Sequence, residues 1–255
     1  MKSQLNEMKY FTEENLRVFI TCPYKFYYEY IEKKKRPKDW RHMVQQVVNH
    51  VVFSYFRLPI EQRSATKILS LVERYWSNIS PQIFESRIQY YTVTAKITDY
   101  LMQNLTAETD SAPPLFLFEK FTSTIQELDM DLSLTIDVAE WSNSSFVVKK
   151  YLVDAEKDML MLYNYLIAVF SKKVFNKIPS RIEVTTLLDG RKHTYFPTPE
   201  RIDEGIRYLQ LMNHLLGNSS RFNEVYNEKD CESCPFEHVC ERDSRNGNES
   251  TTYYS

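Results

Sequence analysis

Hydrophobic residues recur at helical spacing through the first part of the chain. Behind Thr12, a candidate N-cap followed by acidic residues, Leu16, Phe19 and Ile20 predict a first helix, and Pro23 predicts the start of the next one. Longer segments then repeat apolar residues with the period of amphipathic helices: Met43–Phe56, Ala65–Trp76 and, with a weaker pattern, Gln82–Leu105. The N-terminal part of the chain is therefore expected to be helical.

The pattern changes after residues 107–114, where Asp, Ser and two prolines predict a loop. The segments that follow are rich in Thr, Val, Ile and Phe and predict strands: Leu115–Phe121, Ser123–Leu128, Asp131–Trp141 and Phe146–Val153. Ser142–Ser145 has the composition of a hairpin turn between the last two strands. This part of the chain is therefore expected to form a β-meander.

Helical and strand patterns alternate after the meander. The predicted elements are a helix at Lys157–Phe175, strands at Arg181–Leu188 and His193–Phe196 joined by an Asp189–Gly190 turn, and a helix at Thr198–Gly217. This order predicts an α+β protein. An N-terminal helical region (1–106) and a core with the C-terminal region (115–242) are expected to form one cooperative domain, and 243–255 a disordered tail.

Composition excludes several classes of protein. The chain has 255 residues, of which 43% are hydrophobic and 26% charged, as expected of a globular fold with a core. No apolar run approaches the ~20 residues of a membrane span, and the first ten residues are too polar for a signal peptide. Only four glycines occur, too few and too scattered for a glycine-rich phosphate loop. With a net charge of −2, any contact with nucleic acid must come from a local basic patch.

Three of the four cysteines lie close together near the C-terminus, and the fourth lies far upstream. Cys231 and Cys234 form a CxxC pair, Cys240 follows closely, and Cys22 is the remaining thiol. This spacing is typical of metal ligands, because a short loop can direct several thiolates to one point. The residues allow an iron–sulfur cluster or zinc, and His238 allows a Cys3His zinc site. Four unrelated buried thiols are the alternative without a metal.

A basic stretch rich in aromatic residues follows Cys22. Between Lys25 and Arg41 there are seven Lys/Arg against three Asp/Glu, with tyrosines, a phenylalanine and a tryptophan between them. Such a segment can follow a phosphate backbone and stack on bases, although a helix with a solvated basic face has the same composition. The candidate DNA contacts are Lys33, Lys34, Lys35, Arg36, Lys38 and Arg41.

Several of these motifs occur together in one known family. The sequence CPYKFYYEY at a helix start, a histidine in a later helix, a strand hairpin with an Asp, a helix with a Tyr and a terminal CxxC-x5-C resemble the RecB-like branch of the PD-(D/E)XK nucleases. Within it, the chain is most similar to the iron–sulfur subgroup, which includes the AddB nuclease domain and the CRISPR adaptation nucleases. The resemblance extends from Leu16 to Cys240.

The resemblance implies a fold and a cofactor. The fold is a restriction-endonuclease-like core, a mixed sheet flanked by helices, with an N-terminal helical region and a C-terminal cysteine loop. In the subgroup four cysteines hold a [4Fe–4S] cluster that joins the two ends of the domain, so the resemblance favours iron–sulfur over zinc. Its ligands would be Cys22, Cys231, Cys234 and Cys240.

The resemblance also implies an active site for phosphodiester hydrolysis with Mg2+ or Mn2+. His50 and Asp137 match the divalent-metal ligands, Glu119 the acid of the first strand, and Tyr163 the tyrosine of the following helix. Lys150 lies on the hairpin strand where the family carries its lysine. Asp137 is flanked by apolar strand residues, and such a carboxylate is costly to bury without a cation or a partner.

Two departures from the family pattern fall at this site. The hairpin strand should carry an acid-x-Lys motif, but the acid falls on Val148, Lys149 or Lys150, and a strand shifted to use Asp154 lacks the lysine. The glutamine of the helix motif is Met159. A lysine in place of a carboxylate repels a metal ion, so two-ion binding is expected to fail.

These observations predict an iron–sulfur, nuclease-like protein that binds DNA with lost or weakened nuclease activity. It would be a cytoplasmic subunit in DNA processing or repair, beside a helicase or an active nuclease, with no membrane association. One alternative is an active Mg2+/Mn2+-dependent DNA exonuclease or endonuclease that uses a displaced acid such as Asp154 or Glu156. The other is a redox-sensing or protein-interaction module.

Overall fold

A computed structural model describes residues 10–35, 39–107, 113–143, 145–218, 231 and 234–240. The chain divides into two compact units. The larger unit consists of residues 9–13 and 38–213, and the smaller of residues 1–8, 14–37 and 214–255. The predicted tail, 243–255, lies outside the described residues, and the expectation of one cooperative domain stays a prediction.

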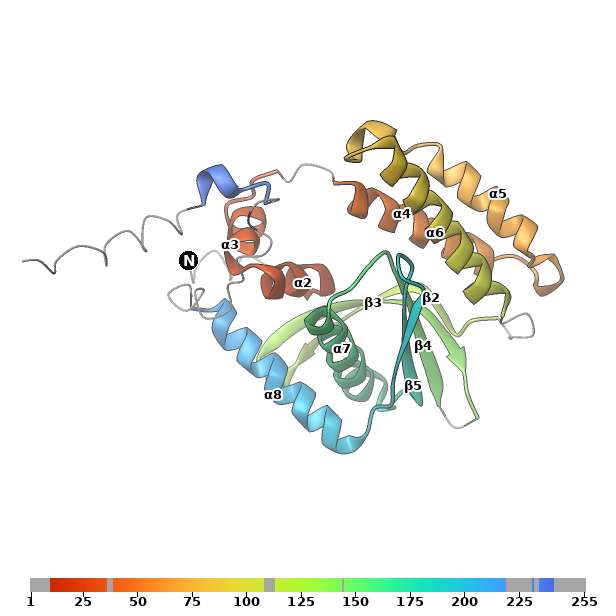
Figure 1. The fold of residues 1–255 in the computed structure, drawn as a ribbon. Helices are drawn as coiled ribbons and strands as arrows, with labels where there is room; N and C mark the ends of the chain where they lie inside the picture. The colour runs from red at the N-terminus through yellow and green to blue at the C-terminus, as the bar shows by residue number, and fades with distance from the viewer. Residues whose placement is uncertain are drawn as a thin grey trace, which may run out of the picture. The chain divides into compact units, whose positions relative to one another are not determined.

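The larger unit is built on a mixed six-stranded sheet (Figure 1). Its strands are β1 (Phe11–Thr12), β2 (Phe116–Ile125), β3 (Met130–Trp141), β4 (Phe146–Leu152), β5 (Arg181–Thr186) and β6 (Arg191–Tyr195). The order is β1-β3-β4-β5-β6, with β2 also paired to β3. β1 is parallel to β3 and β4 to β5, whereas the β2–β3, β3–β4 and β5–β6 pairs are antiparallel.

The helices of the larger unit are α4 (Trp40–Phe56), α5 (Ala65–Trp76), α6 (Arg87–Thr106) and α7 (Lys157–Phe175), and α8 (Pro199–Leu216) continues into the smaller unit. Side chains cap four of them: Asp39, Ser64, Ser86 and Thr198 each accept a hydrogen bond from a backbone N–H of the first helical turn. Short 3-10 turns lie at Ile60–Gln62, Pro81–Ile83 and Gln126–Leu128.

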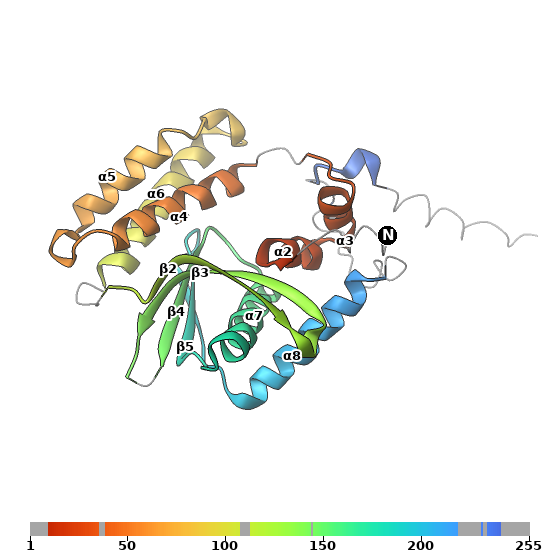
Figure 2. The same cartoon turned by 180° about the vertical axis from the view of Figure 1, so that it is seen from behind.

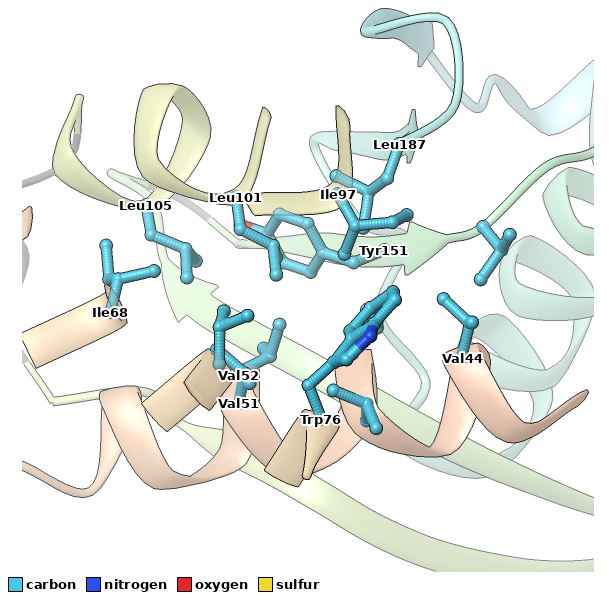
Figure 3. Close-up of a cluster of buried hydrophobic side chains, with 14 of the residues drawn as sticks. Val44, Val51, Val52, Ile68, Trp76, Ile97, Leu101, Leu105, Tyr151 and Leu187 are labelled. Carbon is cyan, nitrogen blue, oxygen red and sulfur yellow. The ribbon is translucent and has the colours of Figure 1, made fainter. Parts of the chain in front are cut away.

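The main hydrophobic core lies between the helices α4–α6 and the sheet (Figures 1 and 3). Val44, Val51 and Val52 of α4 meet Leu101 of α6 and Tyr151 of β4. The valines fall on one side of α4, as the helical period of the sequence predicted. Helix α7 packs against the sheet separately, through a cluster of phenylalanine rings from Phe116, Phe121, Phe146 and Phe175.

The smaller unit contains most of α2 (Glu13–Thr21), and all of α3 (Pro23–Phe26), the π-helix Tyr27–Ile31 and the 3-10 turn Glu237–Val239. Tyr28 joins its N- and C-terminal segments: the hydroxyl donates a hydrogen bond to the Val239 carbonyl at 2.6 Å, and the ring packs on Phe236. Figure 2 shows these elements from behind. Residues far apart in the sequence therefore meet in this unit, as the split cysteine set requires.

The α+β prediction, a mixed sheet flanked by helices, is confirmed, and so is the turn at Ser142–Ser145, whose end residues exchange backbone hydrogen bonds. One strand prediction is wrong: Leu115–Phe121 and Ser123–Leu128 form a single strand, β2, because Thr122 continues the register with β3. Asp129, in the left-handed backbone region at φ 47°, then reverses the chain into β3. In the described part of the chain, no helix is long and apolar enough to cross a membrane.

Candidate functional site

The β3–β4 hairpin brings Asp137 and Lys150 together. Val138 pairs with Lys149 in the antiparallel register, so the next positions along, Asp137 and Lys150, also lie opposite each other. The Lys150 Nζ donates a hydrogen bond to the Asp137 Oδ1 at 3.0 Å. Both residues are almost completely buried, with relative exposures of 7% for Asp137 and 5% for Lys150.

Glu13 adds a second carboxylate to this pair. Its Oε1 lies 2.8 Å from the Lys150 Nζ, and its side chain is mostly buried. Glu13 directly follows β1, whose parallel pairing with β3 (Phe11 with Leu132, Thr12 with Ser133) fixes it beside the hairpin. Sequence reasoning missed this residue because an acid behind an N-cap is already explained by the helix dipole.

Tyr163 closes the group from α7. Its buried ring lies under the Lys150 ammonium, with 5.2 Å between Nζ and the ring centroid, a distance typical of a cation–π contact. The structure thus brings together three residues of the predicted catalytic set, Asp137, Lys150 and Tyr163. We call these three residues and Glu13 the Lys150 site.

The electrostatics of the Lys150 site follow from its burial and its charges. Burial opposes the ammonium form of Lys150, but Asp137, Glu13 and Tyr163 outweigh it and raise the pKa of Lys150 above its ordinary value. Burial raises the pKa of the Asp137 carboxyl, and the Lys150 ammonium offsets only part of that effect. The Lys150 ammonium therefore contacts two carboxylates, and its ion pair with Asp137 lies in a buried environment.

The two departures from the family pattern are visible in the fold. Val148, two residues before Lys150, is buried between Ala139 of β3 and Ile182 of β5, in an apolar environment without a carboxylate. Met159 lies in the first turns of α7, one turn before Tyr163. The strand and helix positions that should carry the acid and the glutamine are therefore both apolar.

Two other predicted site residues, Glu119 and His50, have no contact with the Lys150 site among the described residues. Glu119 pairs in register with Ile136, and its side chain is exposed. His50 is exposed on α4, where its Nδ1 donates to the Gln46 carbonyl at 2.7 Å and its ring lies 5.2 Å from that of Tyr75. No contact joins either residue to the Lys150 site in the described part of the structure, which also contains no cluster of three or more His, Cys, Asp or Glu suited to a metal.

Asp154 and Glu156, the acids that an active nuclease could use instead, contact residues outside the Lys150 site. The Asp154 Oδ2 accepts a hydrogen bond from the Arg41 Nε at 2.9 Å, in an ion pair on the surface. Glu156 precedes α7 at its N-cap position, and its carbonyl accepts a hydrogen bond from the Leu160 backbone N–H. These interactions give both residues structural roles.

The basic segment is only partly described, since Arg36 and Lys38 lie outside the described residues. Lys33, Lys34 and Lys35 are exposed in the smaller unit. Lys34 pairs with Glu32 at 2.8 Å and lies over the Tyr28 ring. In the larger unit, Arg41 stacks on Trp40 in addition to its contact with Asp154. The segment therefore combines exposed cations with aromatic rings.

The four cysteines belong to the smaller unit. Cys22 is buried, and burial raises the pKa of its thiol, with a smaller contribution from the nearby Cys234 and Cys240. A backbone hydrogen bond from Cys234 to the Cys231 carbonyl forms the turn of the CxxC pair. The structure thus places cysteines from both ends of the chain in one unit, and the iron–sulfur cluster or zinc that their spacing predicts stays a prediction.

A solved structure shares the fold of this chain. A protein from Eubacterium rectale, provisionally described as an exonuclease, is similar with a TM-score of 0.51 and 10% sequence identity, over 99% of this chain and 93% of that one. A protein designated SSO0001 matches with a TM-score of 0.39 and 14% identity, over 94% of this chain and 92% of that one, a likeness too low to support an argument. No family model and no curated protein match the sequence.

The likeness to the Eubacterium rectale protein concerns the fold. It agrees with the nuclease-like core that the sequence resemblance predicted, a mixed sheet flanked by helices. The iron–sulfur subgroup within that family stays a prediction.

Proposed function

We propose that this chain is a DNA-binding protein of nuclease fold in which metal-dependent cleavage is lost or weakened. The main support is the Lys150 site. Asp137 and Lys150 form a buried pair, while Val148, two residues before Lys150, stands where an acid-x-Lys motif would carry its acid. Two-ion phosphodiester hydrolysis needs several carboxylates around one point. A single strand carboxylate held by an ammonium supplies too little negative charge for two divalent ions.

DNA is the proposed ligand for two reasons. The fold is shared with a protein provisionally described as an exonuclease, and the chain carries a basic, aromatic segment ending at Arg41. Exposed lysines beside tyrosine and tryptophan rings suit a phosphate backbone and its bases. As a subunit of DNA processing or repair in the reducing cytoplasm, the protein would act beside a helicase or an active nuclease.

In this proposal a [4Fe–4S] cluster on Cys22, Cys231, Cys234 and Cys240 joins the ends of the chain. The cluster would have a structural role, because its ligands come from segments far apart in the sequence. Cys22→Ser should lose iron and lower the melting temperature, whereas His238→Ala should keep its iron. Iron analysis and a thermal melt check this; full iron and an unchanged melt in Cys22→Ser would refute the ligand set, and zinc in place of iron would favour the alternative metal.

The first test of function uses cluster-intact protein and labelled linear single- and double-stranded DNA. Binding is measured by fluorescence anisotropy in EDTA over a range of salt, and cleavage with Mg2+ or Mn2+ beside an Asp137→Ala control. We expect salt-dependent binding with little or no cleavage. Efficient cleavage that Asp137→Ala abolishes would establish an active nuclease instead. Absence of DNA binding would favour a redox-sensing or protein-interaction module.

A further inference from the structure

Helix α6 exposes large apolar side chains on the side that faces away from the core. Its buried residues recur every four positions from Val93 to Leu105 and pack into the main hydrophobic core. Ile88 lies on the other side of the helix and, at 79%, is the most exposed large apolar side chain in the described part of the chain. Tyr91, about one turn further on, is 66% exposed. These two side chains are therefore available to a partner.

The exposed residues of α6 form one continuous surface. Ile88, Tyr91, Thr92, Ala95 and Asp99 follow one another at steps of three or four residues, which places them on the same side of the helix, and all five are exposed. The ring of Tyr91 lies beside the small side chains of Thr92 and Ala95. A large side chain next to small ones is the pattern that lets two helices pack closely. We call these five residues the α6 face.

The ring of Tyr91 is held in place by its own domain. It packs edge-on against Tyr90, with 5.2 Å between the ring centroids. Tyr90 in turn packs against the rings of Trp76 and Phe84. An aromatic side chain that is already ordered loses less conformational entropy when a partner binds it.

The charges on this side of α6 favour a second copy of the chain over a nucleic acid. Arg87 and Lys96 are matched by Glu85 and Asp99, all four of them exposed. A surface without net charge does not attract a phosphate backbone. Arg87 lies at one end of the α6 face and Asp99 at the other, so two copies of the helix that run antiparallel place each Arg87 beside Asp99 of the other copy. The same arrangement brings each Lys96 level with a Tyr91 ring, where a cation–π contact can form.

We propose that two copies of this chain associate through their α6 faces, antiparallel and about a two-fold axis between Thr92 and Ala95. In such a pair the same residues of both copies form the contact, and each Tyr91 packs against the Ala95 side of the other helix. The inference goes beyond the proposed function and does not depend on it. A single pair of helices buries less than the roughly 800 Å² per partner of a standard interface, so the dimer should be weak and depend on concentration.

Sedimentation velocity of the full-length protein, from about 1 µM to about 200 µM, tests the dimer. We expect a shift from monomer to dimer over this range. Ile88→Ala and Tyr91→Ala should each weaken the dimer about tenfold or more, since few residues carry most of the binding energy. Leu211→Ala and Phe196→Ala are the matched controls, because these side chains are also exposed, at 53% and 63%, and lie outside α6. The controls should dimerise like the natural protein.

Two results would overturn the inference. One is a monomer at every concentration. The other is a dimer that Ile88→Ala and Tyr91→Ala weaken no more than the controls do, because association would then use another surface.

A charge exchange tests the antiparallel arrangement. Arg87→Asp and Asp99→Arg should each weaken the dimer, because each places like charges opposite one another. The double variant restores opposite charges and should dimerise within about threefold of the natural protein. Both positions are exposed, and the hydrogen bond of Asp99 to Gln103 lies on the surface, so the fold should be unaffected, as a thermal melt can verify. A double variant as weak as the single ones would exclude this pairing.

Discussion

Two neighbouring lysines of β4, Lys149 and Lys150, are equally buried but lie in different electrostatic surroundings. Successive strand residues point to opposite faces of a sheet, so the two ammonium groups meet different neighbours. Lys149 forms an ion pair with Glu140 of β3. Lys150 contacts the carboxylates of Asp137 and Glu13 and the ring of Tyr163.

The region around Lys149 also contains Glu183, its register partner on β5. Arg181 and Lys192 both form ion pairs with Glu183. This face therefore carries a network of ion pairs that joins three cations and two acids and stabilises the fold. Around Lys150 a single ammonium contacts two carboxylates and an aromatic ring, which come from three other elements of the chain. The comparison teaches that equal burial and equal residue type do not give two lysines the same surroundings.

The largest effect should come from removing each lysine in turn. Lys149→Met and Lys150→Met should each destabilise the protein by about 3–5 kcal/mol, because each leaves buried carboxylate without its cation. The loss should be larger in Lys150→Met, because that lysine is the partner of two carboxylates, whereas Lys149 is the partner of Glu140. Urea unfolding measures both losses. A smaller loss in Lys150→Met than in Lys149→Met would remove the distinction between the regions.

Gln45 tests how much the end of β4 next to Lys150 depends on hydrogen bonds from α4. Its side chain donates to the Tyr151 carbonyl at 2.8 Å and accepts from the Val153 N–H at 2.9 Å, holding β4 just beyond Lys150. Gln45→Ala should cost about 1–3 kcal/mol, because these backbone groups lose their partner.

Gln46→Ala is the control, an exposed neighbour on the same helix for which a change within about 0.5 kcal/mol is expected. Urea unfolding measures the free energy of unfolding of both variants. Equal losses in Gln45→Ala and Gln46→Ala would show that the two hydrogen bonds of Gln45 do not stabilise β4.

The ion pairs of Glu183, in the region around Lys149, should stabilise the protein less in acid. Burial opposes ionisation of Glu183, but Lys192 and Arg181 outweigh it and lower the pKa of the carboxyl below its ordinary value. A carboxyl with a lowered folded-state pKa stabilises the protein above its unfolded-state pKa and loses that contribution as the pH falls through the folded-state value. The free energy of unfolding of the natural protein should therefore exceed that of Glu183→Gln by about 1 kcal/mol at pH 7. This difference should disappear below about pH 4. Urea unfolding from pH 7 to pH 3 measures the difference, and a constant gap would contradict the expectation.

The smallest effect on stability should come from Arg41, whose ion pair with Asp154 is half exposed. Arg41→Ala should change the unfolding free energy by no more than about 1 kcal/mol, as is typical of surface pairs. Its DNA affinity should fall and become less dependent on salt, since one phosphate contact is lost. Lys177→Ala, another exposed cation, is the control for anisotropy titrations. Equal DNA affinity in both variants would exclude Arg41 from the binding surface.

The helical periods of α4 and α5 and the strand composition of β3 and β4 were sufficient to predict the ends of these elements to within three residues. The prediction of two strands in place of β2 was wrong. The composition changes at Thr122, but the pairing of β2 with β3 continues through this residue without a break. The predicted helix start at Gln82 failed because Pro81 and the Ser86 cap place a 3-10 turn before α6. Local signals therefore predicted the type of an element better than its ends.

The candidate site was predictable to the extent that the hairpin could be placed. Once Ser142–Ser145 is a turn, the position of Asp137 opposite Lys150 follows from the antiparallel register, and Tyr163 follows from the family pattern. Glu13 could not be found in this way. It is 137 positions from its partner, and nothing in its neighbourhood in the chain indicates that a two-residue strand will pair with β3.

By itself, the sequence determined the order and type of the main elements, the metal-like spacing of the cysteines and the lack of an acid at Val148, Lys149 and Lys150, where the family pattern would have one. These are properties of residue type and local spacing, which the chain carries without folding. Only the tertiary structure decided that Lys149 is matched by acids and cations on one face, while Lys150 lies between Asp137 and Glu13 on the other. The reason is physical: the energy of a charge depends on its burial and on its neighbours in space, and both are set when distant segments pack.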